Sequence, residues 1–135
     1  MSRRATKPQD VTRSAGEDER LTRLTGICLD LAGAERELCG ASHARFMAKK
    51  RVFAYFLDNH HGDGIAGVAC RVLPGENAAL VAANPKRFFM PAYIGPRGWV
   101  GLRLDVGRVA WSEVAELVRG SYDLVTGKTR AVLTR

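Results

Sequence analysis

The stretch YIGPRGWVGLRLD, residues 93–105, combines a glycine-rich turn with the pattern of a β-strand. In its second half Val100, Leu102 and Leu104 alternate with other residue types, which predicts a half-buried strand. The first half predicts a turn that a ligand could approach closely, because glycine permits positive φ and leaves the backbone accessible. The turn is open to three interpretations: a ligand loop, a nucleic-acid wing, or a hairpin that needs glycine for its geometry alone.

The segments upstream of this stretch predict a hairpin and a short helix. A polar break at Lys49 and Lys50 precedes the aromatic run 52–58, and the Asp63-Gly64 pair favours a hairpin that leads into IAGVACRVL. The run GENAALVAAN predicts a short helix that the Asn84-Pro85 break closes. KRFFMPAYIG then predicts extended chain that enters the turn.

Amphipathic helices are expected at both ends. Ser14 and Glu17 have capping-box spacing, and apolar residues at helical spacing follow as far as Gly33. The second helix carries its apolar face at Trp111, Val114, Leu117, Val118, Tyr122 and Val125. The order helix, strands, short helix, strands, helix predicts an α+β fold with the helices on one face of a sheet. Residues 1–13 predict a flexible arm, and 14–135 a single domain.

Charge and cysteine usage limit the class of protein. The chain has 135 residues and a formal net charge of +7, of which +3 lies in the first thirteen residues. Such a balance favours polyanionic partners. The three cysteines are widely spaced, which predicts reduced thiols and no disulfide framework. There is no apolar run long enough for a membrane span and no secretory signal pattern, so we expect a cytoplasmic protein.

The C-terminal half resembles the MmcQ/YjbR family, small bacterial proteins described as predicted DNA-binding proteins. The shared pattern is an aromatic strand, a Tyr-x-Gly turn, Gly-Trp-Val, Trp-x-Glu-Val and Ser-Tyr. The matching residues are Phe88, Phe89, Tyr93, Gly95, Gly98, Trp99, Val100, Trp111, Glu113, Val114, Ser121 and Tyr122. The match is dense over residues 85–126, and earlier segments agree only in layout.

The resemblance implies a two-layer α+β fold similar to secretion chaperones, with an antiparallel sheet of about five strands against N- and C-terminal helices. It also implies a double wing, two hairpins proposed to hold DNA. The chain departs from the family pattern in two places. Ala110 stands where the family often has an acidic helix cap, and Thr126-Gly127-Lys128 replaces an Ala-Pro-Lys ending.

Basic residues supply the candidate nucleic-acid contacts, mainly to the phosphate backbone of DNA. If strand alternation holds through the Lys49-Lys50 break, Lys49 and Arg51 share a face and Lys50 lies opposite. The alternative for this cluster is a solvated hairpin turn or a charged edge strand. Gly95 and Gly98 would allow close approach of the turn. The full set of candidate contacts is Arg45, Lys49, Lys50, Arg51, Lys86, Arg87, Arg97 and Arg103.

Other chemistry is weakly signalled. Large aromatic residues could stack on bases, but for Trp99 and Trp111 we expect the core. The histidines and cysteines lack zinc-site spacing, so we expect no metal and no cofactor. The sequence shows no nucleophile elbow and no close carboxylate pair. We therefore expect a non-enzymatic DNA-binding domain; the alternatives are a protein- or small-ligand-interaction module on the same fold and, least supported, an enzyme.

Overall fold

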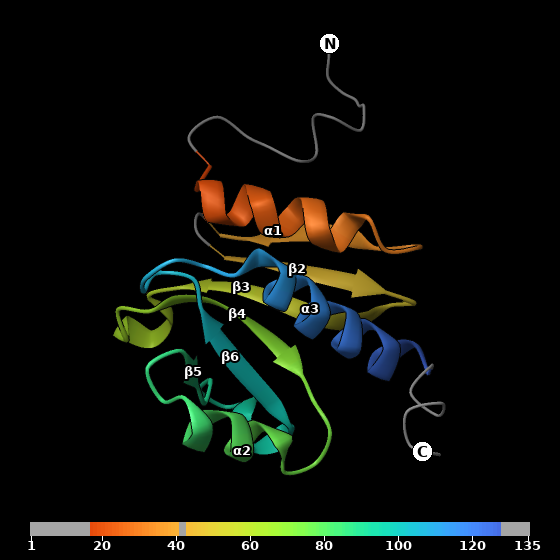
Figure 1. Cartoon of the computed structure of the whole chain (residues 1–135). Coiled ribbons are helices and arrows are strands. Elements are labelled where there is room, and N and C mark those ends of the chain that lie inside the picture. Colours follow the sequence, from red (N-terminus) through yellow and green to blue (C-terminus); the bar gives the residue numbers. More distant parts are fainter. Residues whose placement is uncertain (1–16, 41–42, 128–135) are drawn as a thin grey trace.

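The structure, a computed structural model, describes residues 17–40 and 43–127. Within these residues the elements follow the order shown in Figure 1: α1 (Glu19–Leu29), β1 (Glu35–Cys39), β2 (His43–Ala48), β3 (Arg51–Asp58), the 3-10 turn η2 (His60–Gly62), β4 (Ala66–Arg71), α2 (Glu76–Ala83), β5 (Phe88–Phe89), the 3-10 turn η3 (Gly95–Arg97), β6 (Trp99–Arg103) and α3 (Trp111–Thr126). No helix in this part of the chain has the length and apolar character needed to cross a membrane.

The strands form one antiparallel sheet in the order β1-β2-β3-β4-β6-β5. The expected α+β class is confirmed, with six strands where about five were expected. The sequence of β1, ERELC, is polar and mostly exposed, as suits an edge strand. It therefore lacks the apolar alternation by which a strand is recognised.

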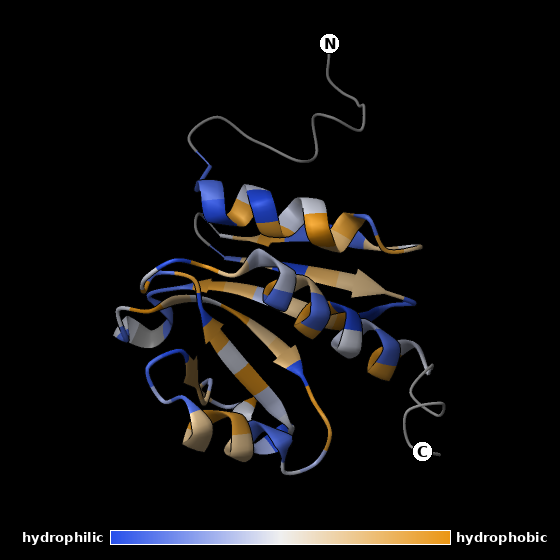
Figure 2. Ribbon diagram, viewed as in Figure 1, coloured by the Kyte–Doolittle hydropathy of each residue, from blue (hydrophilic) through white to orange (hydrophobic). Residues whose placement is uncertain are grey.

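The three helices cover one face of the sheet. Figure 1 shows α1, α3 and α2 in a row across it, with α3 against β3 and β4 and α2 against β5 and β6. Apolar and polar residues alternate around α1 and α3 (Figure 2), so each helix turns an apolar stripe toward the sheet. The core between the layers contains the fully buried Phe46, Phe53 and Phe56. Burial of each such side chain contributes about 2–3 kcal/mol.

The first helix begins later and ends earlier than expected. Asp18 caps it by accepting a hydrogen bond from the backbone N–H of Arg20 at 2.8 Å. The expected cap, Ser14, lies outside the described residues. The helix ends at Leu29, not near Gly33. From β1, Arg36 donates to Glu17 and to the Thr25 hydroxyl, both at 3.0 Å, which ties the helix to the edge strand.

The segment expected to be extended before the glycine turn is a strand only at Phe88–Phe89. Pro91 has no N–H with which to continue the pairing of this edge strand with β6, and the N–H of Trp99 donates to the carbonyl oxygen of Ile94 instead. Tyr93 then takes a left-handed conformation with φ 68°, and the N–H of Gly95 donates to the carbonyl oxygen of Pro91 at 2.9 Å. The chain therefore reverses direction between β5 and β6 through this turn.

The face without helices carries aromatic side chains. Trp99 lies against Tyr55 with 5.4 Å between ring centroids, and it is half-buried. Trp111 is also half-buried and packs against the edge of the core. The expectation that the tryptophans fill the core is therefore wrong for Trp99, which lies on the face without helices, whereas Trp111 packs against the core.

Candidate functional site

Lys49 and Lys50 form the tip of the β2–β3 hairpin. Ala48 pairs with Arg51, so the two lysines are the central residues of a two-residue turn, with φ 52° and 65°. Such turns require the left-handed conformation at both positions. The expected alternation of faces through this segment is therefore wrong, and both lysines are exposed at the tip of a hairpin.

The side chain of Asn77 stabilises the glycine turn at residues 95–98 by hydrogen bonds. The buried amide of Asn77 donates to the carbonyl oxygens of Gly95 at 2.8 Å and Trp99 at 3.2 Å. Gly98 has φ 96°, a conformation that other residues rarely adopt, and its carbonyl oxygen accepts from the N–H of Val72 at 2.9 Å. Packing and geometry thus account for the glycines, and the turn presents the exposed side chain of Arg97.

Three arginines meet around one hollow at the end of the sheet where β3 begins, β4 ends and β6 begins. Arg51, Arg71 and Arg97 line it, and its volume is about 730 Å³. Its other lining residues are apolar or uncharged: Val72, Pro74, Gly75, Asn77, Met90, Gly95, Pro96, Gly98 and Leu124. We call this site the arginine hollow.

The described residues that line the arginine hollow include no carboxylate, although Arg71 also lines a neighbouring cavity that contains Glu76 and Asp123. Within the described part of the chain, Arg51, Arg71 and Arg97 form no ion pair, and all three are exposed. An exposed guanidinium group without a carboxylate partner is suited to bind phosphate, because its planar array of donors matches two phosphate oxygens at once.

The other predicted basic residues lie elsewhere. Arg45 pairs with Glu37 across β1 and β2, and Arg87 pairs with Glu113. Arg103 binds Asp105 through two hydrogen bonds of 2.9 and 3.2 Å. Lys86 is exposed between α2 and β5. The structure therefore brings together Arg51 and Arg97 of the predicted set, with the Lys49-Lys50 tip next to Arg51.

Sequence reasoning missed Arg71. It is the last residue of β4 and the only charged residue in IAGVACRVL. A lone arginine at the end of an otherwise apolar strand was the available signal. What the sequence does not show is that antiparallel pairing puts Arg71 opposite Trp99, directly after the turn that carries Arg97.

His43, His60 and the exposed Cys39 line a smaller cavity of about 240 Å³ on the open face. His43 and His60 meet edge to face at 5.2 Å, and His43 Nε2 lies 3.1 Å from the carbonyl oxygen of Asp58. Among the described residues no three metal-ligating side chains converge. The side chain of His61 lies outside the description.

Comparison with known proteins gives a family match and a structural match. The sequence model of the YjbR family matches residues 29–124, a range that includes all three arginines of the hollow. The chain is also similar to the crystal structure of the Deinococcus radiodurans protein DR2400, which carries a DUF419 family-model domain. The TM-score is 0.63 at 27% sequence identity, and the match covers 80% of each chain. No curated protein matches the sequence.

Proposed function

The chain belongs to the YjbR family, and on that premise we propose that it is a non-enzymatic protein that binds nucleic acid, above all DNA, through phosphate contacts at the arginine hollow. The observation that carries the proposal is the meeting of Arg51, Arg71 and Arg97 around a hollow without a carboxylate. A protein that neutralises phosphates in this way gains affinity by releasing condensed counterions. The backbone positions of the three arginines are set by regular secondary structure, because Arg51 lies in β3, Arg71 in β4 and Arg97 in η3.

The hairpin tip extends the same basic surface. Lys49 and Lys50 directly precede Arg51 and are exposed. An L-residue in the left-handed region costs about 1–2 kcal/mol, and the turn has two such residues. Two lysines at positions that favour asparagine or glycine add charge where a duplex or single strand could meet it.

A binding role fits the lining of the hollow better than a catalytic one. None of the described residues that line it carries a hydroxyl, thiol, imidazole or carboxylate. Acid–base or nucleophilic chemistry would need such a group beside the bound phosphate. The proposal includes a cytoplasmic location, where nucleic acid is available and cysteines stay reduced.

Fluorescence anisotropy with labelled duplex and single-stranded DNA tests the proposal. Three phosphate contacts predict a slope of about −2.7 for log affinity against log salt, or about a 40-fold loss between 50 and 200 mM salt. The test variant changes Arg51, Arg71 and Arg97 to Gln together. We expect it to lose most of the salt-dependent affinity.

A matched control separates the hollow from net charge. Changing Arg45, Arg87 and Arg103 to Gln removes the same three charges from residues that already have carboxylate partners. If both triple variants weaken binding equally, the contact is a general polyanion effect and the arginine hollow is not the site. Absence of binding by the unmodified protein at 50 mM salt would overturn the nucleic-acid function itself.

A further inference from the structure

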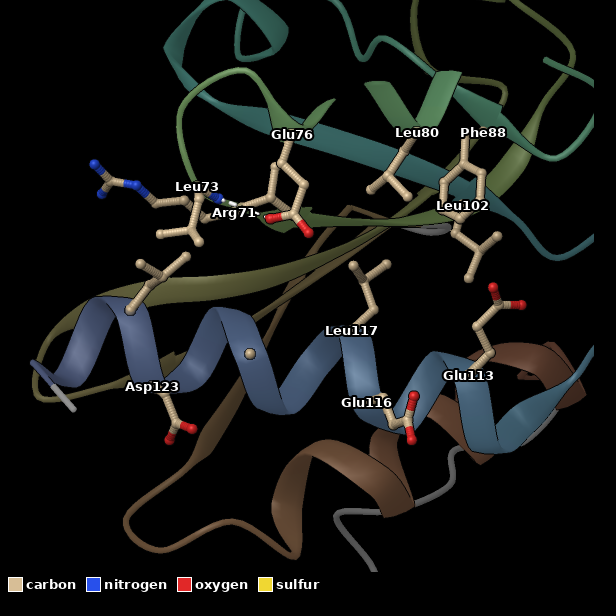
Figure 3. A pocket seen from close by; sticks show the side chains of 13 residues that line it. Arg71, Leu73, Glu76, Leu80, Phe88, Leu102, Glu113, Glu116, Leu117 and Asp123 are labelled. Carbon is tan, nitrogen blue, oxygen red and sulfur yellow. Dashed lines mark hydrogen bonds between the residues drawn. The ribbon is translucent and has the colours of Figure 1, made fainter. Parts of the chain in front are cut away.

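A second concave surface lies between α2 and α3; it adjoins the arginine hollow, with which it shares Arg71, Val72 and Leu124, and its other charged residues are acidic. Figure 3 shows the two helices facing one another across it, with Leu80 and Leu117 on opposite walls and Phe88 and Leu102 from the sheet at one end. Its volume is about 330 Å³. We call it the α2–α3 groove.

The charged groups along the α2–α3 groove are mostly acidic. Glu76, Glu113, Glu116 and Asp123 line it, against one basic residue, Arg71. In Figure 3 the carboxylates of Glu76 and Glu113 approach the groove from opposite walls. On a chain of net charge +7, this reverses the local sign and disfavours nucleic acid.

These carboxylates are available to a ligand to different degrees. Glu113 binds Arg87, and Asp123 lies 3.7 Å from Arg119. Glu76 accepts the N–H of Leu73 at 3.1 Å. An ionised carboxylate has acceptor capacity for further donors, so each can still receive a cation. Glu116 is exposed and forms no ion pair within the described residues.

Open space lies beside Gly120 in the middle of α3. Gly120 lines the groove, and a Cβ atom built on it would meet nothing within 4 Å. Glycine inside a helix costs about 1 kcal/mol relative to alanine. The space above Gly120, between Leu117 and Leu124, is therefore room for a group from outside the described fold.

We propose that the α2–α3 groove docks a basic amphipathic segment of a partner protein. One or two of its apolar side chains enter between Leu80 and Leu117, and flanking lysines or arginines bind Glu76 and Glu116. The charge pattern favours this occupant, because a neutral apolar peptide would leave the acidic rim unused and an acidic one would be repelled. The volume of about 330 Å³ accommodates a few anchoring side chains. This proposal does not rest on nucleic-acid binding, and the two sites share Arg71.

Binding of a fluorescein-labelled amphipathic lysine–leucine peptide tests the groove, and the same peptide with glutamate in place of lysine is its control. We expect the full chain to bind the lysine peptide and not the glutamate peptide. Glu76→Lys with Glu116→Lys should weaken binding at least tenfold. Glu19→Lys with Glu35→Lys makes the same charge change at exposed sites on α1 and β1, and should change it less than twofold.

Shape is tested separately from charge at Gly120. Gly120→Trp should fill the groove and weaken binding at least tenfold, whereas Gly120→Ala should leave it unchanged. Circular dichroism checks that each variant folds, and Glu116→Lys alone serves if the loss of the Glu76 cap unfolds the double variant. Equal binding by all variants, or binding of the glutamate peptide, overturns the proposal. So does a groove variant that changes self-association in ultracentrifugation, because the occupant would then be a second copy.

Discussion

The hydroxyl of Ser121 accepts a hydrogen bond from the backbone N–H of Arg71 at 2.9 Å. The same hydroxyl donates to the carbonyl oxygen of Phe53 at 2.6 Å. Phe53 is the residue left unpaired where the β2–β3 register shifts, so Ser121 satisfies a group that the ladder leaves out. A single side chain on α3 thus joins two strands and fixes the backbone that carries one arginine of the hollow.

Replacing Ser121 with alanine should therefore destabilise the fold. Ser121 is fully buried, and its loss removes a hydrogen-bond partner from the part-buried N–H of Arg71 and from the buried carbonyl of Phe53. We expect the free energy of unfolding to fall by about 1–3 kcal/mol in urea denaturation. Ser112→Ala, at an exposed position of the same helix, should change it by less than about 0.5 kcal/mol. Equal effects at the two serines would contradict the structural role assigned to Ser121.

The elements that the sequence predicted well are those whose signals are local. Helix α3, the β3–β4 hairpin and helix α2 each have an internal apolar period or a turn pair that marks them. The Ser-Tyr pair was recognisable as a motif, but its purpose was not. The structure shows that Ser121 bonds two strands and that the Tyr122 hydroxyl donates to the carbonyl oxygen of Ala32 at 2.6 Å.

The parts that the sequence could not supply depend on pairing between distant segments. The arginine hollow needs the ends of β3, β4 and β6 in one place, and no local pattern gives the strand order. A hairpin turn at Lys49 and Lys50 was one of the alternatives that the sequence left open, but its left-handed conformation was not predicted because lysine is rare at such positions. The carboxylate partner of Arg87, which comes from α3, likewise could not be identified before the fold was known.

The N-terminus of α3 offers a stabilising substitution. Ala110 is its N-cap, with φ −88° and ψ 92°, and alanine provides no side-chain acceptor for the free N–H groups. Ala110→Asp should raise the free energy of unfolding by about 0.5–2 kcal/mol. Ala110→Asn separates capping from charge, because only the aspartate also gains from the helix dipole. Thermal unfolding at low and high salt measures both, and a loss of stability in both variants would argue against this cap assignment.

Gly101 and Phe89 should show strong energetic coupling. The ring of Phe89 covers Gly101, and a Cβ atom at that position would collide with the ring. Gly101→Ala alone should cost about 1–3 kcal/mol through overpacking. In Phe89→Ala the space is free, so adding Gly101→Ala should cost much less. A double-mutant cycle in urea gives the coupling, expected at about 0.5–3 kcal/mol. Strict additivity would mean that the ring does not occupy this position.

The three thiols should differ sharply in reactivity. Burial raises the pKa of Cys28, with a smaller contribution from Cys70, and burial likewise raises the pKa of Cys70. Cys39 is exposed on β1. At pH 8 we expect Ellman's reagent to modify Cys39 rapidly and the other two only on unfolding. Fast reaction of two or more thiols in the folded protein would contradict their burial.

The same burial predicts a loss of stability in alkali. Unfolded thiols ionise near pH 8.5, whereas the folded Cys28 and Cys70 keep their protons. Above that pH the unfolded chain binds fewer protons than the folded one, so the free energy of unfolding falls as pH rises. Urea denaturation at pH 7.5 and 9.5 should show this fall. Cys70→Ala should reduce the pH-dependent part, and Cys39→Ser should leave it unchanged.

Salt dependence distinguishes an arginine that binds phosphate from one that binds a carboxylate. Arg71 has no ion pair within the described residues and lines the hollow, whereas Arg103 binds Asp105. Arg71→Gln should make the slope of log affinity against log salt shallower by about 0.9, the loss of one phosphate contact. Arg103→Gln frees a carboxylate but removes no phosphate contact, so its slope should match that of the unmodified protein. Anisotropy titrations of DNA at four salt concentrations give both slopes. If Arg103→Gln makes the slope shallower and Arg71→Gln does not, DNA binds at the Arg103 end of β6 and not at the arginine hollow.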